Sequence, residues 1–313
     1  MRRMGALRGV QLVLMAPQDE RDAFRRHGAE GVLLLGGGAA ILLQLADPRV
    51  ARGVARHSGF RERPLDRLLG TLDYVYAIGF GDDDVADAAV RTVNARHAPV
   101  HGPASPEHPE YSAFDADAQR WVASTLLAVA LELHERLWGP LDAAAGDAIV
   151  RNYAALGHRL QSAPAGWPDS RAEFDAWWAE RLTRLEVGAD ARSVARSLLS
   201  GASGLPFGAA AFLPLVRIIT AALLPPDVRE AYGFRWTPRV EHVANGWLDS
   251  IATVWPFLPR MIRHAPMHAS LRRARRRSRY AELEHEDDDD PATTAPERGA
   301  RQHRSAYRRR VEP

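Results

Sequence analysis

Hydrophobic residues recur along most of the chain at spacings of three and four, whereas the strict alternation of a half-buried strand is nearly absent. This pattern predicts helices over about 18–28, 31–46, 48–57, 64–79, 83–97, 115–138, 141–161, 171–184, 190–200, 207–224, 227–232, 238–254 and 256–276. Four prolines, at 99, 103, 106 and 109, predict a long loop after the fifth helix. We therefore expect an all-α fold.

The composition changes near the C-terminus. Five arginines fall between Arg272 and Arg277, and an acidic run extends from Glu282 to Asp290. The two runs nearly neutralise each other, which favours a solvated helix end followed by a disordered tail over a nucleic-acid-binding or membrane-binding arm. We expect a single all-α domain over residues 1–280 and a polar, disordered tail over 281–313.

Two absences restrict the chemistry. The chain has no cysteine, and all 41 of its basic residues are arginine. Thiolate-ligated haem, iron–sulfur clusters, Schiff-base catalysis and P-loop nucleotide hydrolysis are therefore excluded. A metal must be held by His, Asp, Glu or Tyr side chains.

Charge and hydropathy indicate where the protein works. The net charge is only +2, so we expect no nucleic-acid partner. The apolar runs 31–46 and 209–224 are shorter than the roughly 20 residues that a membrane span needs. We expect a soluble, cytoplasmic protein without a transmembrane span.

A glycine-rich segment from Gly31 to Gly38 invites comparison with dinucleotide-binding loops. The G-x-G-x-x-G spacing fails, however, because Ile41 stands where the third glycine is needed, and no alternation of strands and helices follows. We interpret the segment as an apolar helix whose glycines allow a neighbour or a flat ligand to approach closely.

The fifth predicted helix ends in a histidine. Ala86, Val90, Val93 and His97 form one stripe, so His97 closes the apolar face of this helix. From the pattern alone a hydrogen-bonded core histidine is favoured. The alternative is a proximal haem ligand, because an imidazole directed into an apolar cavity is the usual axial ligand. His101 follows, but an intervening proline ends the helix, so a two-histidine site is a weaker hypothesis.

One stripe of the fourth predicted helix carries polar groups. Arg67, Thr71, Tyr74 and Ile78 share this stripe, while the opposite face is apolar. An arginine beside a hydroxyl suits a haem propionate or a distal oxygen ligand. A solvated polar face is the alternative.

A longer series of motifs then becomes recognisable. It runs Leu42-Leu43-Gln44-Leu45-Ala46-Asp47-Pro48, Val54-Ala55-Arg56-His57-Ser58, Arg67-Leu68-Leu69-Gly70-Thr71, Phe80-Gly81, His97-Ala98-Pro99-Val100-His101-Gly102, Tyr111-Ser112-Ala113-Phe114-Asp115 and Trp121-Val122, followed by Leu223-Leu224-Pro225, Arg229, Tyr232-Gly233 and Pro259-Arg260. In order and spacing this series resembles the rubber-oxygenase (latex-clearing protein) and MpaB-type oxygenase family. The resemblance covers roughly residues 25–275.

The resemblance implies an all-α fold that binds haem b through an axial histidine and carries out oxygen-dependent oxidation. His97, Val100 and Gly102 match the H-x-x-V-x-G segment of the family, which makes His97 the implied iron ligand. His101 is the fallback metal ligand.

The resemblance also implies roles for residues of the distal haem face. Arg67 and Thr71 match the Arg-x-x-x-Thr pair of the family. Arg67 is expected to anchor a propionate or polarise bound oxygen, and Thr71 to donate to the distal ligand, so both are candidate catalytic residues. Gln44 and His57 are expected to line or brace the haem pocket.

The chain departs from the family pattern at three positions. Gly70 stands where rubber oxygenases can have a distal lysine, and Asp47 and Ala123 stand where the family more often has histidine. An open or water-ligated sixth position and a substrate other than polyisoprene are the resulting hypotheses.

The sequence thus favours a haem-b-dependent oxygenase that takes O2 and a small apolar organic substrate. A non-catalytic haem-binding sensor or carrier is the first alternative, and a haem-less interaction protein with an arginine-rich tail is the second. The oligomeric state stays open.

Overall fold

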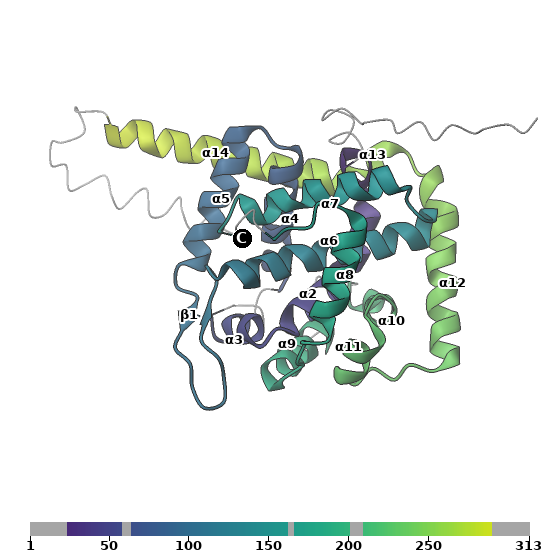
Figure 1. The fold of residues 1–313 in the computed structure, drawn as a ribbon. Coiled ribbons are helices and arrows are strands. Elements are labelled where there is room, and N and C mark those ends of the chain that lie inside the picture. Colours follow the sequence, from purple (N-terminus) through teal and green to yellow (C-terminus); the bar gives the residue numbers. More distant parts are fainter. Residues whose placement is uncertain (1–23, 58–63, 162–165, 201–208, 290–313) are drawn as a thin grey trace, which may run out of the picture.

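A computed structural model describes residues 24–57, 64–161, 166–200 and 209–289, and it confirms the all-α fold (Figure 1). Its helices are α2 (Gly37–Leu45), α3 (Pro48–His57), α4 (Pro64–Phe80), α5 (Asp83–His97), α6 (Ala116–Trp138), α7 (Ala143–His158), α8 (Arg171–Leu182), α9 (Ala189–Ser200), α10 (Leu213–Ala222), α11 (Pro226–Ala231), α12 (Pro238–Val254), α13 (Arg260–Arg263) and α14 (Ala265–Asp289). Three 3-10 helices, η1 (Gly31–Gly36), η3 (Ala209–Phe212) and η4 (Trp255–Phe257), precede or link some of them.

Helix α6 lies in the middle of the molecule (Figure 1). Its Trp121, Leu127 and Leu133 side chains are fully buried. One cluster of buried side chains joins α6 to α2, α9, α10 and α12, and a second joins it to α7 and α8. A helix that is apolar on nearly all sides is expected at the centre of a helical domain, so α6 organises the core.

Side chains cap several helices as the sequence directs. Asp115 accepts a hydrogen bond from the backbone N–H of Ala118 at 2.7 Å, and Asp142 accepts one from Ala145 at 2.7 Å. Such caps satisfy backbone donors that the first turn of a helix leaves free. They fix where α6 and α7 begin.

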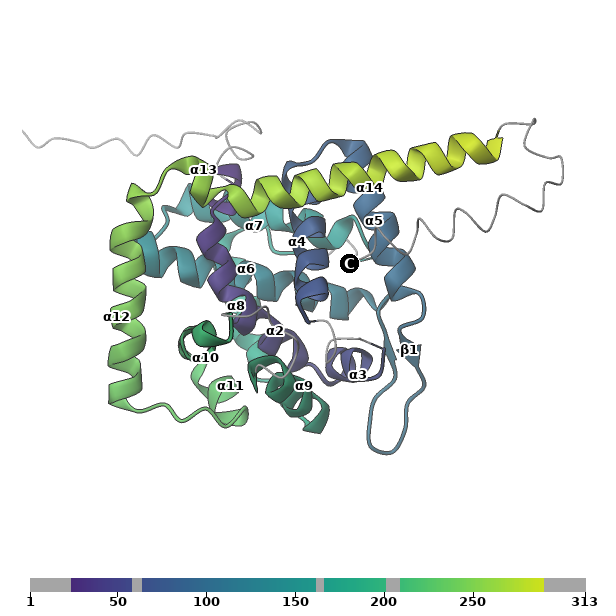
Figure 2. The ribbon, with the colours of Figure 1, turned by 180° about the vertical axis from the view of Figure 1, so that it is seen from behind.

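The C-terminal helix α14 crosses α4 and α5 on the outside of the molecule (Figure 2). Arg273 of α14 forms an ion pair with the buried Asp73 of α4 at 2.7 Å. The helix continues to Asp289, so its last residues, 281–289, belong to the segment that was expected as a polar tail. The remainder of that tail, 290–313, lies outside the described residues, as does the part of the first predicted helix before residue 24.

Some predicted helices are divided. The segment 31–46 begins as η1 and continues as α2, and 256–276 is split among η4, α13 and α14. Leu258 has an extended backbone (φ −69°, ψ 139°) because Pro259 disfavours a helical residue before it. The loop after α5 contains a short hairpin that the sequence pattern did not indicate, β1 (His101–Gly102) paired with β2 (Tyr111–Ser112).

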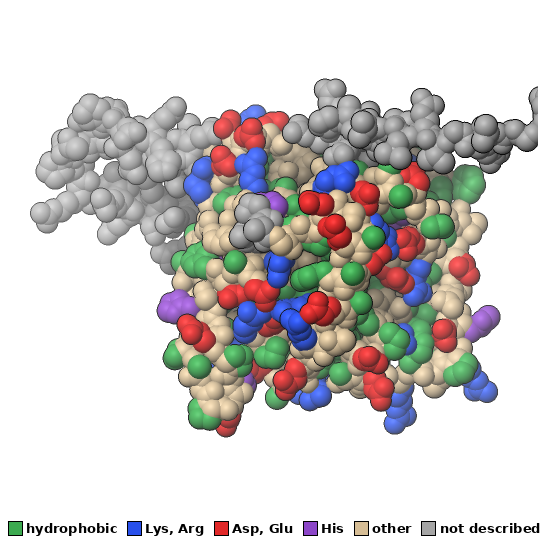
Figure 3. All heavy atoms as spheres, in the orientation of Figure 1, with side chains coloured by type: hydrophobic (Ala, Val, Ile, Leu, Met, Phe, Trp, Pro, Cys, Tyr) green, Lys and Arg blue, Asp and Glu red, His purple; other side chains and the backbone are tan. Residues whose placement is uncertain are grey.

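The face seen in Figure 1 carries acidic and basic side chains close together rather than a patch of one sign (Figure 3). In the described ranges, no single helix is long and apolar enough to cross a membrane, although a bent pair, residues 31–45 with 48–57, meets the criterion by length and composition.

Candidate functional site

A cavity opens beside the last turn of α5, and we call it the His97 cavity. It has a volume of about 260 Å³. Its walls come from α2 to α7 and from the hairpin, and its lining residues are Gln44, Arg49, Val50, Gly53, Val54, Arg67, Gly70, Thr71, Tyr74, Val93, Arg96, His97, Val100, Tyr111, Ser112, Ala113, Ala118, Gln119, Val122, Ala123, Leu126, Leu156 and Leu160. Small-molecule sites occupy about 300–1,000 Å³, so this cavity is close to the lower end of that range.

The tertiary structure brings four of the expected site residues to this cavity. Gln44, Arg67, Thr71 and His97 come from α2, α4 and α5, and all four line it. These positions are far apart in sequence, so their convergence is a property of the fold.

His97 presents a neutral imidazole to the cavity. Its Nδ1 atom is buried and has no hydrogen-bond partner among the described residues. Burial, with a smaller contribution from the positive charge of Arg67, lowers the pKa of His97 to about 4. A neutral, unpartnered imidazole is the form that binds a metal ion.

A chain of amides holds the end of α5 in place. Asn94 accepts a hydrogen bond from Gln161 at 3.0 Å, and Gln161 is joined to Gln119 of α6 through both its backbone and its side chain. Gln119 also donates to the backbone oxygen of Ala113 at 2.8 Å. The turn that carries His97 is therefore tied to α6 and to the residues after β2.

The residues after His97 shape the neighbouring wall. A Cβ atom at Gly102 would lie 2.6 Å from the ring of Tyr111, so only glycine leaves room for that ring. The Tyr111 hydroxyl lies 2.8 Å from Nε2 of His57. His97 and Val100 therefore both line the cavity, and Gly102, two residues further on, leaves room for the ring of Tyr111.

Two guanidinium groups face the same cavity as His97. Arg67 and Arg96 both line it, and neither has a hydrogen-bonded or ion-paired carboxylate in the described part of the chain. Burial and the charge of Arg96 lower the pKa of Arg67. Gly70 makes room for Arg96, because a Cβ there would lie 2.6 Å from its Nη1 atom. The position where rubber oxygenases can have a lysine is thus covered by an arginine from α5.

The other expected residues occupy different places. The Thr71 hydroxyl donates to the backbone oxygen of Arg67 at 3.0 Å, and the Gln44 amide donates to the Thr125 hydroxyl at 3.1 Å. His57 is exposed and does not line the cavity, but it holds Tyr111, which does. The fallback ligand His101 is exposed on β1 and is not part of the cavity wall.

A second space, which we call the inner cavity, lies behind the wall that carries Arg67 and Thr71. It has a volume of about 140 Å³ and is lined mainly by aliphatic residues of η1, α2, α4 and α6. The two cavities share Gln44, Val50, Val54, Arg67, Thr71 and Leu126. A ligand in the inner cavity would therefore lie next to a ligand in the His97 cavity.

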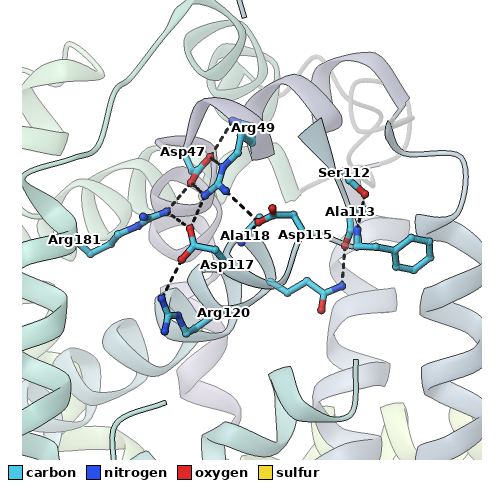
Figure 4. Close-up of polar contacts among 11 residues, drawn as sticks. Asp47, Arg49, Ser112, Ala113, Asp115, Asp117, Ala118, Arg120 and Arg181 are labelled. Atoms are coloured by element: carbon cyan, nitrogen blue, oxygen red, sulfur yellow. Dashed lines mark hydrogen bonds and ion pairs between the residues drawn. The ribbon is translucent and has the colours of Figure 1, made fainter. Parts of the chain in front are cut away.

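A network of ion pairs joins α3, α6 and α8 beside the His97 cavity (Figure 4). The buried carboxylate of Asp47 contacts Arg49 and Arg181, each at 2.8 Å. Arg49 also reaches Asp115 at 3.1 Å and Asp117 at 2.7 Å. Asp47, which stands where the family more often has histidine, therefore has a structural role.

Sequence reasoning missed two residues of this site. Arg96 precedes His97 in the chain, so it falls outside the apolar stripe that drew attention to its neighbour. Tyr111 follows four prolines in a segment expected to be an irregular loop, and only the hairpin turns it toward the cavity.

Among the described residues, no three His, Asp or Glu side chains gather as a set of metal ligands. His97 is accordingly a single candidate ligand on an otherwise mostly apolar wall. A metal held there would need most of its ligands from a non-protein group.

Comparisons with known proteins agree with this architecture. The family described as "ER-bound oxygenase mpaB/B'/Rubber oxygenase, catalytic domain" matches residues 24–254. Two uncharacterised proteins, one from Mycobacterium bovis and one from Mycobacterium tuberculosis, are each 30% identical over 218 residues, which covers 68% of this chain and 84% of theirs. No solved structure matches the chain significantly. The chain therefore belongs to the mpaB and rubber-oxygenase catalytic-domain family.

Proposed function

We propose that this protein is a haem-b-dependent oxygenase that acts on an apolar organic substrate. The observation that carries the proposal is the pairing, on one cavity, of a neutral unpartnered imidazole with two guanidinium groups that lack carboxylate partners. Membership of an oxygenase family supports the reaction class.

The residues present fit haem b. Its ring is flat and apolar, its edge carries two carboxylates, and its iron needs an axial ligand from the protein. In the His97 cavity, Val50, Val54, Val93 and Val122 offer an apolar wall, and Arg67 and Arg96 can pair with carboxylates. His97 would hold the iron. Ala123, where the family more often has histidine, leaves extra room on the wall contributed by α6.

Each side chain has a distinct task in this arrangement. His97 stays neutral down to a pH well below the physiological range. Its ring nitrogen can therefore bind a metal ion without first releasing a proton. Arg67 and Arg96 orient the carboxylate edge. Thr71 keeps its hydroxyl at the wall shared with the inner cavity, where its oxygen can accept a further hydrogen bond while its proton is donated to the backbone oxygen of Arg67. Haem bound through a neutral histidine supplies O2 binding and oxidation that side chains cannot provide.

The first test is the visible absorption spectrum of full-length protein produced with haem supply. The wild-type protein should show a Soret band, which His97→Ala should lose or strongly shift. His101→Ala is the matched control, because His101 is four residues away and exposed, and its spectrum should equal that of the wild type. Absence of a Soret band from wild-type protein with intact helical circular dichroism would refute the proposal.

A second test addresses the arginines. Arg67→Gln and Arg96→Gln should each weaken haem retention about ten- to hundredfold, because a charge-assisted hydrogen bond is worth roughly 1.5–3 kcal/mol. Arg91→Gln is the control, since Arg91 is exposed on the same helix as Arg96 and does not line the cavity. Equal retention by all three variants would remove the arginines from the haem site.

Product formation separates an oxygenase from a haem carrier. Ferrous protein that receives O2 and an apolar alkene should release an oxygenated product, whereas a carrier releases none.

A further inference from the structure

Two tyrosine hydroxyl groups lie in the otherwise mostly aliphatic wall of the inner cavity. Tyr76 of α4 and Tyr153 of α7 both line it, with only 4% and 7% of their surfaces exposed. Within the described ranges neither hydroxyl makes a hydrogen bond to the protein, and neither is among the polar atoms sealed off from space, so both hydroxyls are open to the cavity. By contrast, the buried Tyr74 hydroxyl donates to the backbone oxygen of Leu156, and that of Tyr232 donates to Leu42.

A phenolic hydroxyl that faces an apolar cavity gives up hydrogen bonds that it would make in water. Native proteins rarely leave two such groups unsatisfied around one cavity. The cavity is far larger than one water molecule requires, and most of its wall is aliphatic, so water alone would be poorly held. The two phenols therefore indicate a ligand that carries an oxygen function on an apolar body.

The position of the phenols sets the direction of that ligand. Tyr76 and Tyr153 do not line the His97 cavity, whereas Arg67 and Thr71 line both cavities. Along α4, Thr71 and Tyr76 are five residues apart, which corresponds to about 7.5 Å. An oxygen function held by the phenols leaves the hydrocarbon part of the ligand directed at the shared wall.

The oxygen function should be uncharged. Among the described residues that line the inner cavity, Arg67 at the shared wall is the single cation. Burial, together with the negative charge of the nearby Glu30, raises the pKa of the Tyr76 phenol to about 12. A carboxylate at the phenols would be buried without a counter-charge, whereas an alcohol or ketone needs only hydrogen bonds.

We propose that the inner cavity is the substrate site and that it binds an apolar alcohol or ketone, with the oxygen on Tyr76 and Tyr153 and the hydrocarbon end at the wall of Arg67 and Thr71. The bound alcohol or ketone is a substrate only if the protein is an oxygenase, so this inference rests on the proposed function. It places the oxidised carbon at the end of the molecule remote from the existing oxygen.

The test measures binding to the full-length protein under nitrogen, so that no turnover occurs. Hexan-1-ol, heptane and hexanoate compete with a fluorescent apolar probe for wild type, Tyr76→Phe and Tyr153→Phe. Each Phe variant keeps the ring and loses one hydroxyl. Each should weaken hexan-1-ol binding about three- to tenfold, as one hydrogen bond of roughly 0.5–1.5 kcal/mol predicts, and leave heptane unchanged. Hexanoate should bind worse than hexan-1-ol to wild type.

Tyr232→Phe is the matched control, because it loses a phenolic hydroxyl bonded to a backbone oxygen outside the cavity. Its affinities for all three probes should equal those of the wild type. Hexan-1-ol binding that is the same in wild type and both cavity variants would overturn the proposal and leave the space to water or plain hydrocarbon. Because this readout does not use the Soret band, loss of haem binding and loss of alcohol binding are separate results.

Discussion

Desolvation of single histidines is the main electrostatic feature at the residue scale. His97 and His134 are both held neutral by burial, which lowers the pKa of each to about 4. His134 lies on α6, 8% exposed, with its ring 4.3 Å from that of His27 and its Nδ1 atom unpartnered in the described part of the chain. The two imidazoles differ in surroundings: the first faces the His97 cavity, and the second is packed among aromatic rings.

His134 makes a prediction about acid stability. The unfolded chain takes up a proton at this residue near pH 6.5, while the folded chain does so only near pH 4. The unfolded state therefore binds more protons between these values, so the free energy of unfolding falls as the pH is lowered from 6.5 to 4. Urea unfolding at pH 7 and pH 4.5 should show a smaller loss for His134→Phe than for wild type. If the free energy of unfolding fell equally in His134→Phe and wild type, the His134 imidazole would already be protonated in the folded state at pH 4.5.

At the scale of the helices, glycine residues allow neighbouring helices to pack closely. A Cβ at Gly36 would lie 2.4 Å from Val129 of α6, and one at Gly38 would lie 2.2 Å from the hydroxyl of Thr220 in α10. The neighbouring Gly37 faces the inner cavity, where the nearest atom, of Leu68, is 3.8 Å away. Two glycines of this segment thus allow close packing against α6 and α10, and the third leaves space in the inner cavity. This agrees with its interpretation as an apolar helix that allows close approach by a neighbour.

Adjacent glycines of this segment provide a matched pair of variants. Gly38→Ala should lower the free energy of unfolding by about 1–3 kcal/mol, because the buried Thr220 must move. Gly37→Ala should leave it unchanged or raise it by about 0.5–1 kcal/mol, since alanine is the better helix former and has room. Denaturant unfolding of both variants checks this. A Gly37→Ala protein as unstable as Gly38→Ala would contradict the packing described for α2.

At the scale of the whole molecule, the ion-pair network around Asp47 adds polar contacts between α3, α6 and α8, which also meet in the hydrophobic core. The starts of α3 and α6 and the end of α8 meet there (Figure 4), and Arg49 and Ala118 of these elements also line the His97 cavity. Arg181 also lies over the ring of the buried Trp121, 5.5 Å from its centroid. The network therefore couples the shape of the cavity to the packing of α8.

Removal of the central carboxylate should be costly. Asp47→Asn leaves Arg49 and Arg181 without their shared buried partner, and the free energy of unfolding should fall by about 3 kcal/mol. Arg184→Gln is the control, because the Arg184–Glu180 pair is about two-thirds exposed and such pairs contribute less than about 1 kcal/mol. Equal stability of the two variants in urea would mean that the network contributes little.

Much of the candidate site could be predicted because its signals are local. His97 closes an apolar stripe, and Arg67 and Thr71 share a helical face, so helix periodicity alone places each side chain on its element. Family motifs then indicate which elements meet. Arg96, Tyr111 and the Tyr76–Tyr153 pair could not be found in this way, because nothing local shows which residues face a space between helices.

The sequence by itself determined the all-α class and the restriction of metal ligands to oxygen and imidazole groups. These follow from helical periodicity and from the absence of cysteine. Only the tertiary structure decided that two cavities share one wall, that Asp47 is bound by two arginines and that α14 continues to Asp289 across α4 and α5. Contacts between distant segments depend on how helices pack together, and the spacing of residues along the chain does not contain that information.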